Sequence, residues 1–177
     1  TLICLIVGFP VAMAITFAAP KWRPWLLLGI MLPFWTNLLI RTYALMALMH
    51  LHVARMSARQ DASGGLLLLE EQDRTLWDRQ RIQLGLAWLA QSALGDNFSR
   101  YHAEAGIAAE HCLAPSLQET RWDRVVECYA LLERVAPSPI HQLIRAVAVA
   151  EWQGPAAGLA VLEGFEPPTW LAGSYLW

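Results

Sequence analysis

RWDRVVECYALLERVAPSPIHQLIRAVAVAEWQGPAAGLAVLEGF, residues 121–165, decides the fold of this chain. Apolar side chains in its first part recur at spacings of three and four, which places them on one face of an α-helix. These side chains are Trp122, Val125, Val126, Tyr129 and Leu132. Pro137 and Pro139 end that helix, because proline lacks an amide proton and disfavours helix in the residue before it.

Two further helices are predicted in the same stretch. Ser138 suits the N-cap of the first, with Pro139 at its first position, and Gly154 ends it. Pro155 then starts the second. The side chains expected on the buried faces are Leu143, Val147, Ala150, Leu159, Leu162 and Phe165. Small residues at helix crossings, in pairs of about 34 residues, are typical of a tetratricopeptide-like array.

The composition divides the chain into two parts with different charge. Hydrophobic residues make up 56% and charged residues only 16%, so a membrane component must be considered. Asp61 is the first of the 15 acidic residues, whereas five basic residues precede it. The three cysteines are odd in number and form no CxxC pair, which favours a reducing cytoplasm over a disulfide framework. The chain begins at Thr1 rather than Met, which indicates a fragment.

The first 44 residues are predicted to form a hydrophobic helical hairpin. Leu2 to Ala19 carries no charge and spans about 27 Å as a helix, marginally enough to cross a bilayer core. A basic turn, PKWRP, separates it from a second apolar run, Trp25 to Ile40. We expect residues 2–40 to insert into the inner membrane with this turn on the cytoplasmic side. The alternative is a pair of buried core helices.

The remainder, residues 45–177, is predicted to be an all-α domain. Gln60 to Gly65 is a loop by composition, and Leu66 to Leu69 is either an extended edge or the start of a helix. A helix capped by Asp73 or Thr75 follows, and another spans 98–113. The apolar stripe expected on the first of these consists of Trp77, Ile82, Leu86 and Leu89.

Charged residues gather in EEQDRTLWDRQR, residues 70–81. An aromatic side chain amid charges is typical of an interface anchor, so this segment is a candidate partner-binding surface. Its predicted contact residues are Asp73, Arg74, Trp77, Asp78 and Arg81. The alternative is a solvated helix face with local ion pairs, each contributing a few tenths of a kcal/mol.

No pattern in the sequence indicates catalysis, a cofactor or a metal. GxGxxG, Walker, GxSxG and HExxH motifs are all missing, so we predict a protein that is not an enzyme. His50 and His52 point apart on a helix and cannot share a metal ion. The net charge of −2 disfavours direct nucleic-acid binding. Asp123 and Arg145 either form a buried ion pair between helices or are both solvated.

The early run FPVAMAITFAAPKWRPWLLLGIMLPFWTNLLIRTYALM resembles the first membrane helices of the permease subunit of polyamine (spermidine/putrescine-type) ABC transporters. LPFWTNLLIRTYA is the specific part of this resemblance. It covers about a quarter of the chain and implies a truncated membrane permease component, with no substrate-binding residue carried over.

The later segments ALMALMHLHVARMSARQDASGGLLLLEEQDRTLWDRQRI and 121–165 resemble the C-terminal extension of a group of extracytoplasmic-function sigma factors. In that family the extension is a helical, tetratricopeptide-like domain that follows the promoter-binding regions. For residues 45–177 the resemblance implies a cytoplasmic, regulatory interaction domain. The implied partners are RNA polymerase or the DNA-binding regions of a sigma factor. Two such resemblances in one sequence indicate a chimeric or truncated chain.

Overall fold

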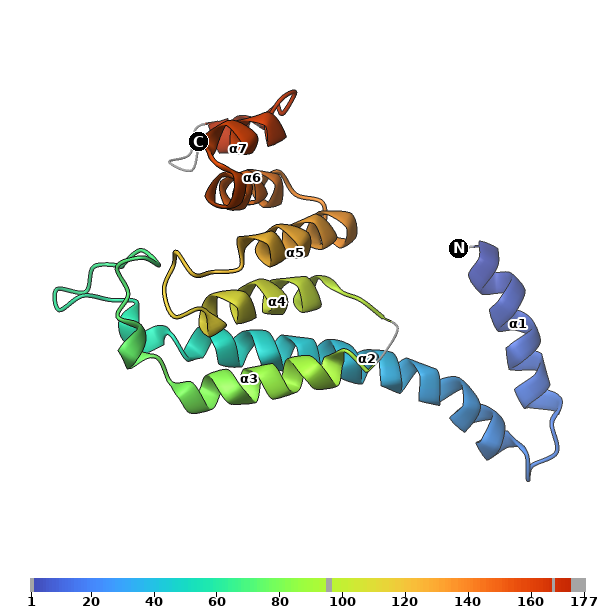
Figure 1. The fold of residues 1–177 in the computed structure, drawn as a ribbon. Helices are drawn as coiled ribbons and strands as arrows, with labels where there is room; N and C mark the ends of the chain where they lie inside the picture. The colour runs from blue at the N-terminus through green and yellow to red at the C-terminus, as the bar shows by residue number, and fades with distance from the viewer. Residues whose placement is uncertain (1, 95–96, 167, 173–177) are drawn as a thin grey trace. The chain divides into compact units, whose positions relative to one another are not determined.

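The computed structural model describes residues 2–94, 97–166 and 168–172, and within them the protein is all-α (Figure 1). An isolated antiparallel bridge between Gln60 and Leu66 is the one β-type pairing among these residues. The prediction of an all-α fold is therefore confirmed. The helices are α1 (Leu2–Phe17), α2 (Arg23–Val53), η1 (Met56–Ala58), η2 (Arg74–Leu76), α3 (Arg79–Ser92), α4 (Arg100–Leu113), α5 (Trp122–Val135), α6 (Pro139–Gln153), α7 (Pro155–Val161) and α8 (Thr169–Ala172), where η denotes a 3-10 helix.

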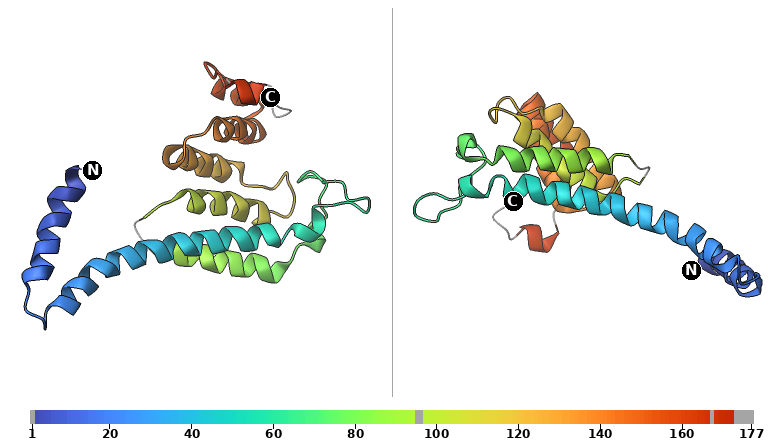
Figure 2. Two further views of the ribbon diagram at one scale, coloured as in Figure 1. Left: turned by 180° about the vertical axis from the view of Figure 1, so that it is seen from behind. Right: turned by 90° about the horizontal axis from the view of Figure 1, so that it is seen from below.

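The chain forms two compact units, residues 1–39 and 40–177, and α2 contributes to both. In the second unit the end of α2 lies beside α3, and α4, α5, α6 and α7 follow as successive layers (Figures 1 and 2). Consecutive helices in this series pack against one another, from α3 and α4 through to α6 and α7. The second unit is thus an array of stacked helices, as expected for a tetratricopeptide-like arrangement.

Two hydrophobic clusters hold the second unit together. The first joins the end of α2 to α3 and α4, and the second joins α4 to α5 and α6. The first contains Leu51, Ala54, Ala58, Trp77, Ile82, Ala108, Ala109 and Cys112; the second contains Ala103, Ile107, Val125, Leu132 and Ala148. The predicted inner face of α5 is confirmed, since Val125 and Leu132 are buried and the other three members pack against the second cluster.

Helices approach closely where the sequence supplies glycine. A Cβ atom at Gly158 of α7 would lie 2.6 Å from the Cβ of Ala150 and 2.7 Å from the carbonyl oxygen of Ala146. At Gly85 of α3 it would lie 2.8 Å from the Cγ of Leu51. Both crossings therefore need a residue without a side chain.

The buried faces predicted for α6 and α7 were partly wrong. Val147 is 55% exposed and Leu159 is 68% exposed, whereas Ala146, Ala148 and Gly158 are buried. The other four residues of that set, Leu143, Ala150, Leu162 and Phe165, are half-buried. The two helices turn their smallest residues toward each other, because backbones that approach this closely leave no room for large side chains between them.

The ends of α6 agree with the prediction. Pro139 occupies the first position after Ser138 at the N-cap, and Pro155 starts α7 directly after the break. Gly154 separates the two helices with a φ of +96°, a conformation that side-chain-bearing residues rarely adopt. This glycine lets α6 and α7 form a tight helical hairpin.

The helix predicted to start near Asp73 or Thr75 begins later, at Arg79, so that prediction was wrong. The Asp73 carboxylate accepts hydrogen bonds from the Thr75 amide (2.9 Å) and hydroxyl (2.7 Å) and caps only the short η2 turn. Asp78 caps α3 by accepting from the Arg81 amide at 3.0 Å. Trp77 between them is extended backbone rather than a member of the helical stripe.

The segment before η2 follows the loop prediction. Asp61 accepts hydrogen bonds from the amides of Ser63 (2.7 Å) and Gly65 (2.9 Å), which closes a turn with Gly64 at a φ of +85°. Leu66 pairs with Gln60 in the isolated bridge. The extended alternative is therefore correct at Leu66.

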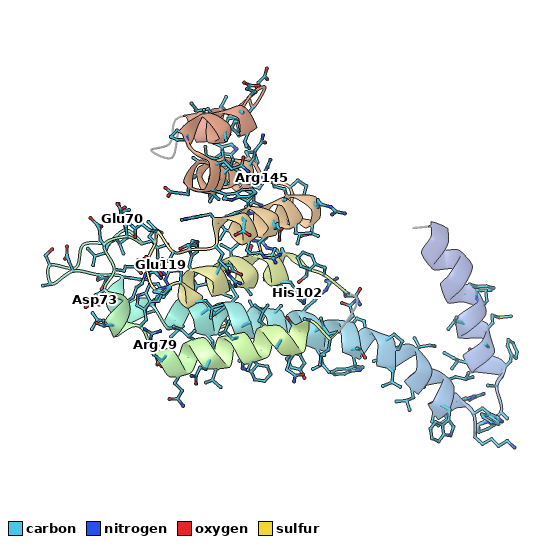
Figure 3. All side chains as sticks on the ribbon, in the orientation of Figure 1. Glu70, Asp73, Arg79, His102, Glu119 and Arg145 are labelled. Atoms are coloured by element: carbon cyan, nitrogen blue, oxygen red, sulfur yellow. The ribbon has the colours of Figure 1, made fainter. Side chains whose placement is uncertain are left out.

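Neither alternative for Asp123 and Arg145 describes the ion pair that forms. Arg145 of α6 donates from Nε to Oε1 of Glu133 on α5 at 2.8 Å, and both side chains are about one quarter exposed (Figure 3). Glu133 lies near the end of α5, level with the start of the antiparallel α6, whereas Asp123 lies at the opposite end. The antiparallel order of the two helices determines which acid Arg145 reaches.

Candidate protein-interaction groove

A cavity of about 440 Å³ opens on the second unit, within the size range of known ligand pockets. It lies against the end of α2, the segment that follows it, α4, α5 and α6. We call it the groove. Its lining residues are His52, Arg55, Arg59, Leu69, Glu104, Ile107, Ala108, His111, Tyr129, Leu132, Ile140, His141 and Ile144.

The part of the groove formed by α4, α5 and α6 is mainly apolar. Ile107 (8% exposed) and Leu132 (2% exposed) belong to the core beneath it. Ile144 on α6 is 40% exposed at its edge. Burial raises the pKa of Tyr129 to about 12, so the phenol stays neutral. This side of the groove is suited to apolar side chains of a ligand.

The part formed by the end of α2 and residues 55–59 is basic. Arg55 and Arg59 lie here, and the Arg59 side chain is exposed with no hydrogen bond or ion pair to any residue that the structure describes. Glu104 is the one acidic residue of the lining, and it accepts from Arg100 at 2.7 and 3.1 Å. The groove therefore carries more positive than negative charge.

Trp77 supports the basic side from within the core. The indole is 4% exposed, and the guanidinium groups of Arg74 and Arg55 lie 4.6 and 5.2 Å from the ring centroid. Arg74 also donates from Nη1 to the carbonyl oxygens of His111 (2.7 Å) and Ala114 (2.8 Å), at the end of α4. These contacts fix the segment after α2 against the first layers of the array.

His111 lies between the two sides of the groove and is neutral at pH 7. Burial, reinforced by the charges of Arg55 and Arg74, lowers its pKa to about 4. Its Nδ1 atom and the Nε atom of Arg55 are both buried and lack a hydrogen-bond partner among the described residues. Burial raises the pKa of Cys112, so this thiol is not an activated nucleophile.

The five residues predicted to contact a partner separate into two groups. Trp77 is in the core and Arg74 holds it there, so neither is displayed as a surface anchor. Asp73, Asp78 and Arg81 are exposed, and Arg81 pairs with Asp78 at 3.2 Å (Asp73 is labelled in Figure 3). That this set contacts a partner stays a prediction.

Sequence reasoning missed the groove itself. Its lining comes from four helices and a loop, and no short pattern links them. One signal was present: Arg55 and Arg59 precede the first acidic residue of the chain. Among the described residues, no three His, Cys, Asp or Glu side chains are grouped so that they could hold a metal ion. The arrangement is suited to noncovalent binding.

Comparison with known proteins finds one family and two kinds of relatives to which the chain is similar. Residues 36–93 match a family of unknown function, DUF6596. An uncharacterised protein of Rhizobium meliloti is 42% identical over 119 residues, which are 67% of this chain and 28% of that protein. The spermidine/putrescine transport system permease protein PotB is 51% identical in Haemophilus influenzae and 49% in Escherichia coli, each over 45 residues.

The permease match covers 25% of this chain and 16% of the permease. The chain thus spans less than a third of the length of these relatives. No solved structure matches it. The chain is similar to a family of unknown function over residues 36–93 and, over a quarter of its length, to a polyamine permease.

Proposed function

We propose that residues 45–177 form a non-enzymatic interaction domain that binds RNA polymerase or the promoter-binding regions of a sigma factor and thereby regulates transcription initiation. The groove is the observation that carries this proposal. Stacked helix pairs present a concave surface to a segment of a partner, and here that surface has a basic and an apolar side. The resemblance of the sequence to sigma-factor extensions supplies the class of partner.

Co-purification tests this proposal. The full chain, tagged and expressed in a bacterial host, is solubilised in mild detergent and captured, and bound polymerase subunits and sigma factors are identified by mass spectrometry. We expect both polymerase and a sigma factor above the background of an untagged control. Absence of both from the captured material would refute the proposal.

Two matched variants connect the result to the groove. Ile144→Asp places a charge on the apolar edge of the groove, at a position that is 40% exposed. Leu131→Asp does the same on α5, at a position that is 38% exposed and outside the groove. We expect Ile144→Asp to lose the partner, because the new charge lies in the groove, and Leu131→Asp to retain it. The two positions are similarly exposed, so the two changes should affect folding equally.

A second candidate function, a truncated polyamine permease component inserted in the inner membrane, is favoured by the first unit. Arg23–Ala58 is the one segment of the described residues long and apolar enough to cross a membrane, and Gly8–Phe17 is a shorter apolar helix. Large apolar side chains such as Phe17 (78% exposed) and Trp25 (68% exposed) have no protein cover.

Three polar side chains of this unit, those of Thr16, Arg23 and Thr36, donate hydrogen bonds to backbone carbonyl oxygens of the same unit, as helices in lipid require. Thr16 and Thr36 donate to carbonyl oxygens four residues earlier, at 2.8 and 2.9 Å. Arg23 donates to the carbonyl oxygens of Thr16 (2.8 Å) and Ala18 (3.1 Å), at the end of α1.

Membrane fractionation tests the second candidate. If residues 2–40 insert, the expressed chain sediments with membranes and resists extraction by carbonate. Recovery of the chain in the soluble fraction would contradict insertion. This outcome is independent of co-purification with polymerase, so the two candidate functions are tested separately.

A further inference from the structure

Positive charge in the groove is left without a matching acid, and this indicates the chemistry of its ligand. Glu104 is already engaged by Arg100 at 2.7 Å. Among the described residues, neither Arg55 nor Arg59 has a carboxylate partner. The other four ion pairs of the described residues do not involve Arg55 or Arg59. The groove therefore keeps two arginines without a carboxylate partner among the described residues.

Arg55 is held in a partly desolvated position, where a charge without a counter-ion is costly. Burial lowers its pKa, and the neighbouring Arg59 and Arg74 act in the same direction. Its polar contacts are a long hydrogen bond of 3.5 Å to Gln72 and the face of Trp77. An anion at this end of the groove would offset the repulsion among these guanidinium groups.

The apolar side of the groove decides which kind of anion fits. Ile107, Leu132, Ile140 and Ile144 line it, and these aliphatic side chains suit the leucine-like residues of a protein segment. Nucleic-acid bases instead stack on large aromatic side chains, and Tyr129 is the one Phe, Tyr or Trp residue of the lining. The net charge of −2 also opposes a polyanionic backbone.

We propose that the groove binds an acidic, amphipathic peptide segment of a partner protein, with a carboxylate held by Arg55 and Arg59 and aliphatic side chains against Ile140 and Ile144. This inference rests on the proposed interaction function and names the chemistry of the segment that the groove takes. The basic residues of the groove, Arg55 and Arg59, flank η1 after the end of α2, and the apolar residues that the ligand would contact, Ile140 and Ile144, lie on α6, so the ligand would lie across α4 and α5.

Fluorescence anisotropy with short labelled peptides tests this inference on the full chain in mild non-ionic detergent. Three probes share leucines at i, i+3, i+4 and i+7 and carry glutamate, glutamine or lysine at the remaining positions. We expect the glutamate peptide to bind at least about tenfold more tightly than the lysine peptide, with the glutamine peptide between them. Added salt reduces this difference, because the charged contacts are exposed enough to be screened.

A charge-reversal pair assigns the effect to the groove. Arg59→Glu should weaken binding of the glutamate peptide by at least about fivefold and narrow its advantage over the lysine peptide. Arg134→Glu makes the same change at an exposed arginine on α5 outside the groove and should leave the glutamate peptide's affinity unchanged. Circular dichroism of both variants verifies that the helices are retained.

Equal binding of the glutamate and lysine peptides, no binding of either, or equal losses in the two variants would overturn the inference. The inference would also be overturned if a labelled single-stranded oligonucleotide bound more tightly than the glutamate peptide and this oligonucleotide binding were lost in Arg59→Glu. Polymerase capture with no preference for acidic peptides would leave the proposed function intact and reject only this inference. Acidic-peptide binding without polymerase capture would reject the transcription role alone.

Discussion

Gly158→Ala provides a sharp test of how the helical array closes. Alanine is a better helix former than glycine by about 1 kcal/mol, so on helix propensity alone the substitution would stabilise α7. The structure predicts the opposite sign. The added methyl group would lie 2.6 Å from the Cβ of Ala150 and 2.7 Å from the carbonyl oxygen of Ala146. Neither neighbour is the end of a flexible side chain, so α7 must move away from α6.

The magnitude follows from these two opposing effects. Overpacking of a close helix crossing costs about 1–3 kcal/mol, and the gain in propensity offsets about 1 kcal/mol of it. We therefore expect Gly158→Ala to lower the free energy of unfolding by up to about 2 kcal/mol. For a chain of this size, that corresponds to a fall in Tm of up to about 8 °C.

Urea unfolding monitored by circular dichroism measures this difference, and Ala160→Gly is the matched control. Ala160 lies on the exposed side of the same helix, so its substitution reports the intrinsic preference for alanine and should cost about 1 kcal/mol. The steric argument predicts that both substitutions destabilise the protein. If Gly158→Ala stabilises it by about the amount that Ala160→Gly removes, the close crossing of α6 and α7 is refuted.

Three further predictions concern the core, one histidine and one ion pair. Leu132→Ala should cost about 2–5 kcal/mol in urea unfolding because the side chain is 2% exposed, whereas Leu131→Ala, at 38% exposed, should stay within about 0.5 kcal/mol; equal effects would contradict the assigned face of α5. The pKa of His111 is lowered from 6.5 to about 4, so between these pH values the unfolded chain binds more protons than the folded protein. The contribution of His111 to the free energy of unfolding is therefore complete above pH 6.5 and falls as the pH drops toward 4. His111→Gln should flatten this pH dependence in unfolding curves recorded across that range. A double-mutant cycle of Glu133→Gln and Arg145→Gln should give a coupling of about 0.5–1 kcal/mol, since their 2.8 Å contact is half-buried; zero coupling would contradict the pair.

Local chemistry explains why many element boundaries could be predicted from the sequence. Pro139, Gly154 and Pro155 act through their own backbone properties, so their positions determine where α6 begins and ends and where α7 begins. The inner face of α5 was also predictable, because its apolar period follows a regular helix. These features need no information about the neighbouring layers.

Features that depend on contacts between layers were not predictable in this way. Val147 and Leu159 have the period of core residues, but they are exposed because α6 and α7 meet through Ala146 and Gly158. Arg145 pairs with Glu133, since the antiparallel packing of α6 on α5 decides which acid lies within reach. Sequence spacing alone did not distinguish Glu133 from Asp123.

At the candidate site, the environment of Trp77 also depended on packing that the local sequence did not reveal. Its charged neighbours suggested an exposed interface anchor, yet the indole is buried and both Arg55 and Arg74 pack against it. Asp73 ends one short turn and Asp78 begins the next helix, which leaves Trp77 extended and directed into the core. The N-cap was predicted at Asp73 or Thr75 rather than at Asp78, and the position of the core relative to this segment was not visible in the sequence.

His102 is a structural residue that the sequence did not reveal. Its Nδ1 accepts from the Ser99 amide at 3.1 Å, which leaves Nε2–H to donate to the Ser92 carbonyl oxygen at 3.3 Å (Figure 3). The ring therefore caps the start of α4 and links it to the end of α3. A serine followed three residues later by a histidine was the local signal, although glutamate or glutamine is the usual partner in such a cap.

Site-specific photo-crosslinking in cells tests the central claim, that the groove is the surface that binds a protein partner. A photoreactive amino acid replaces Ile144 at the groove edge in one variant and Leu131 outside the groove in the other. We predict adducts with polymerase subunits or a sigma factor from position 144 and none from position 131. Adducts of equal yield from both positions, or none from position 144, would contradict the account.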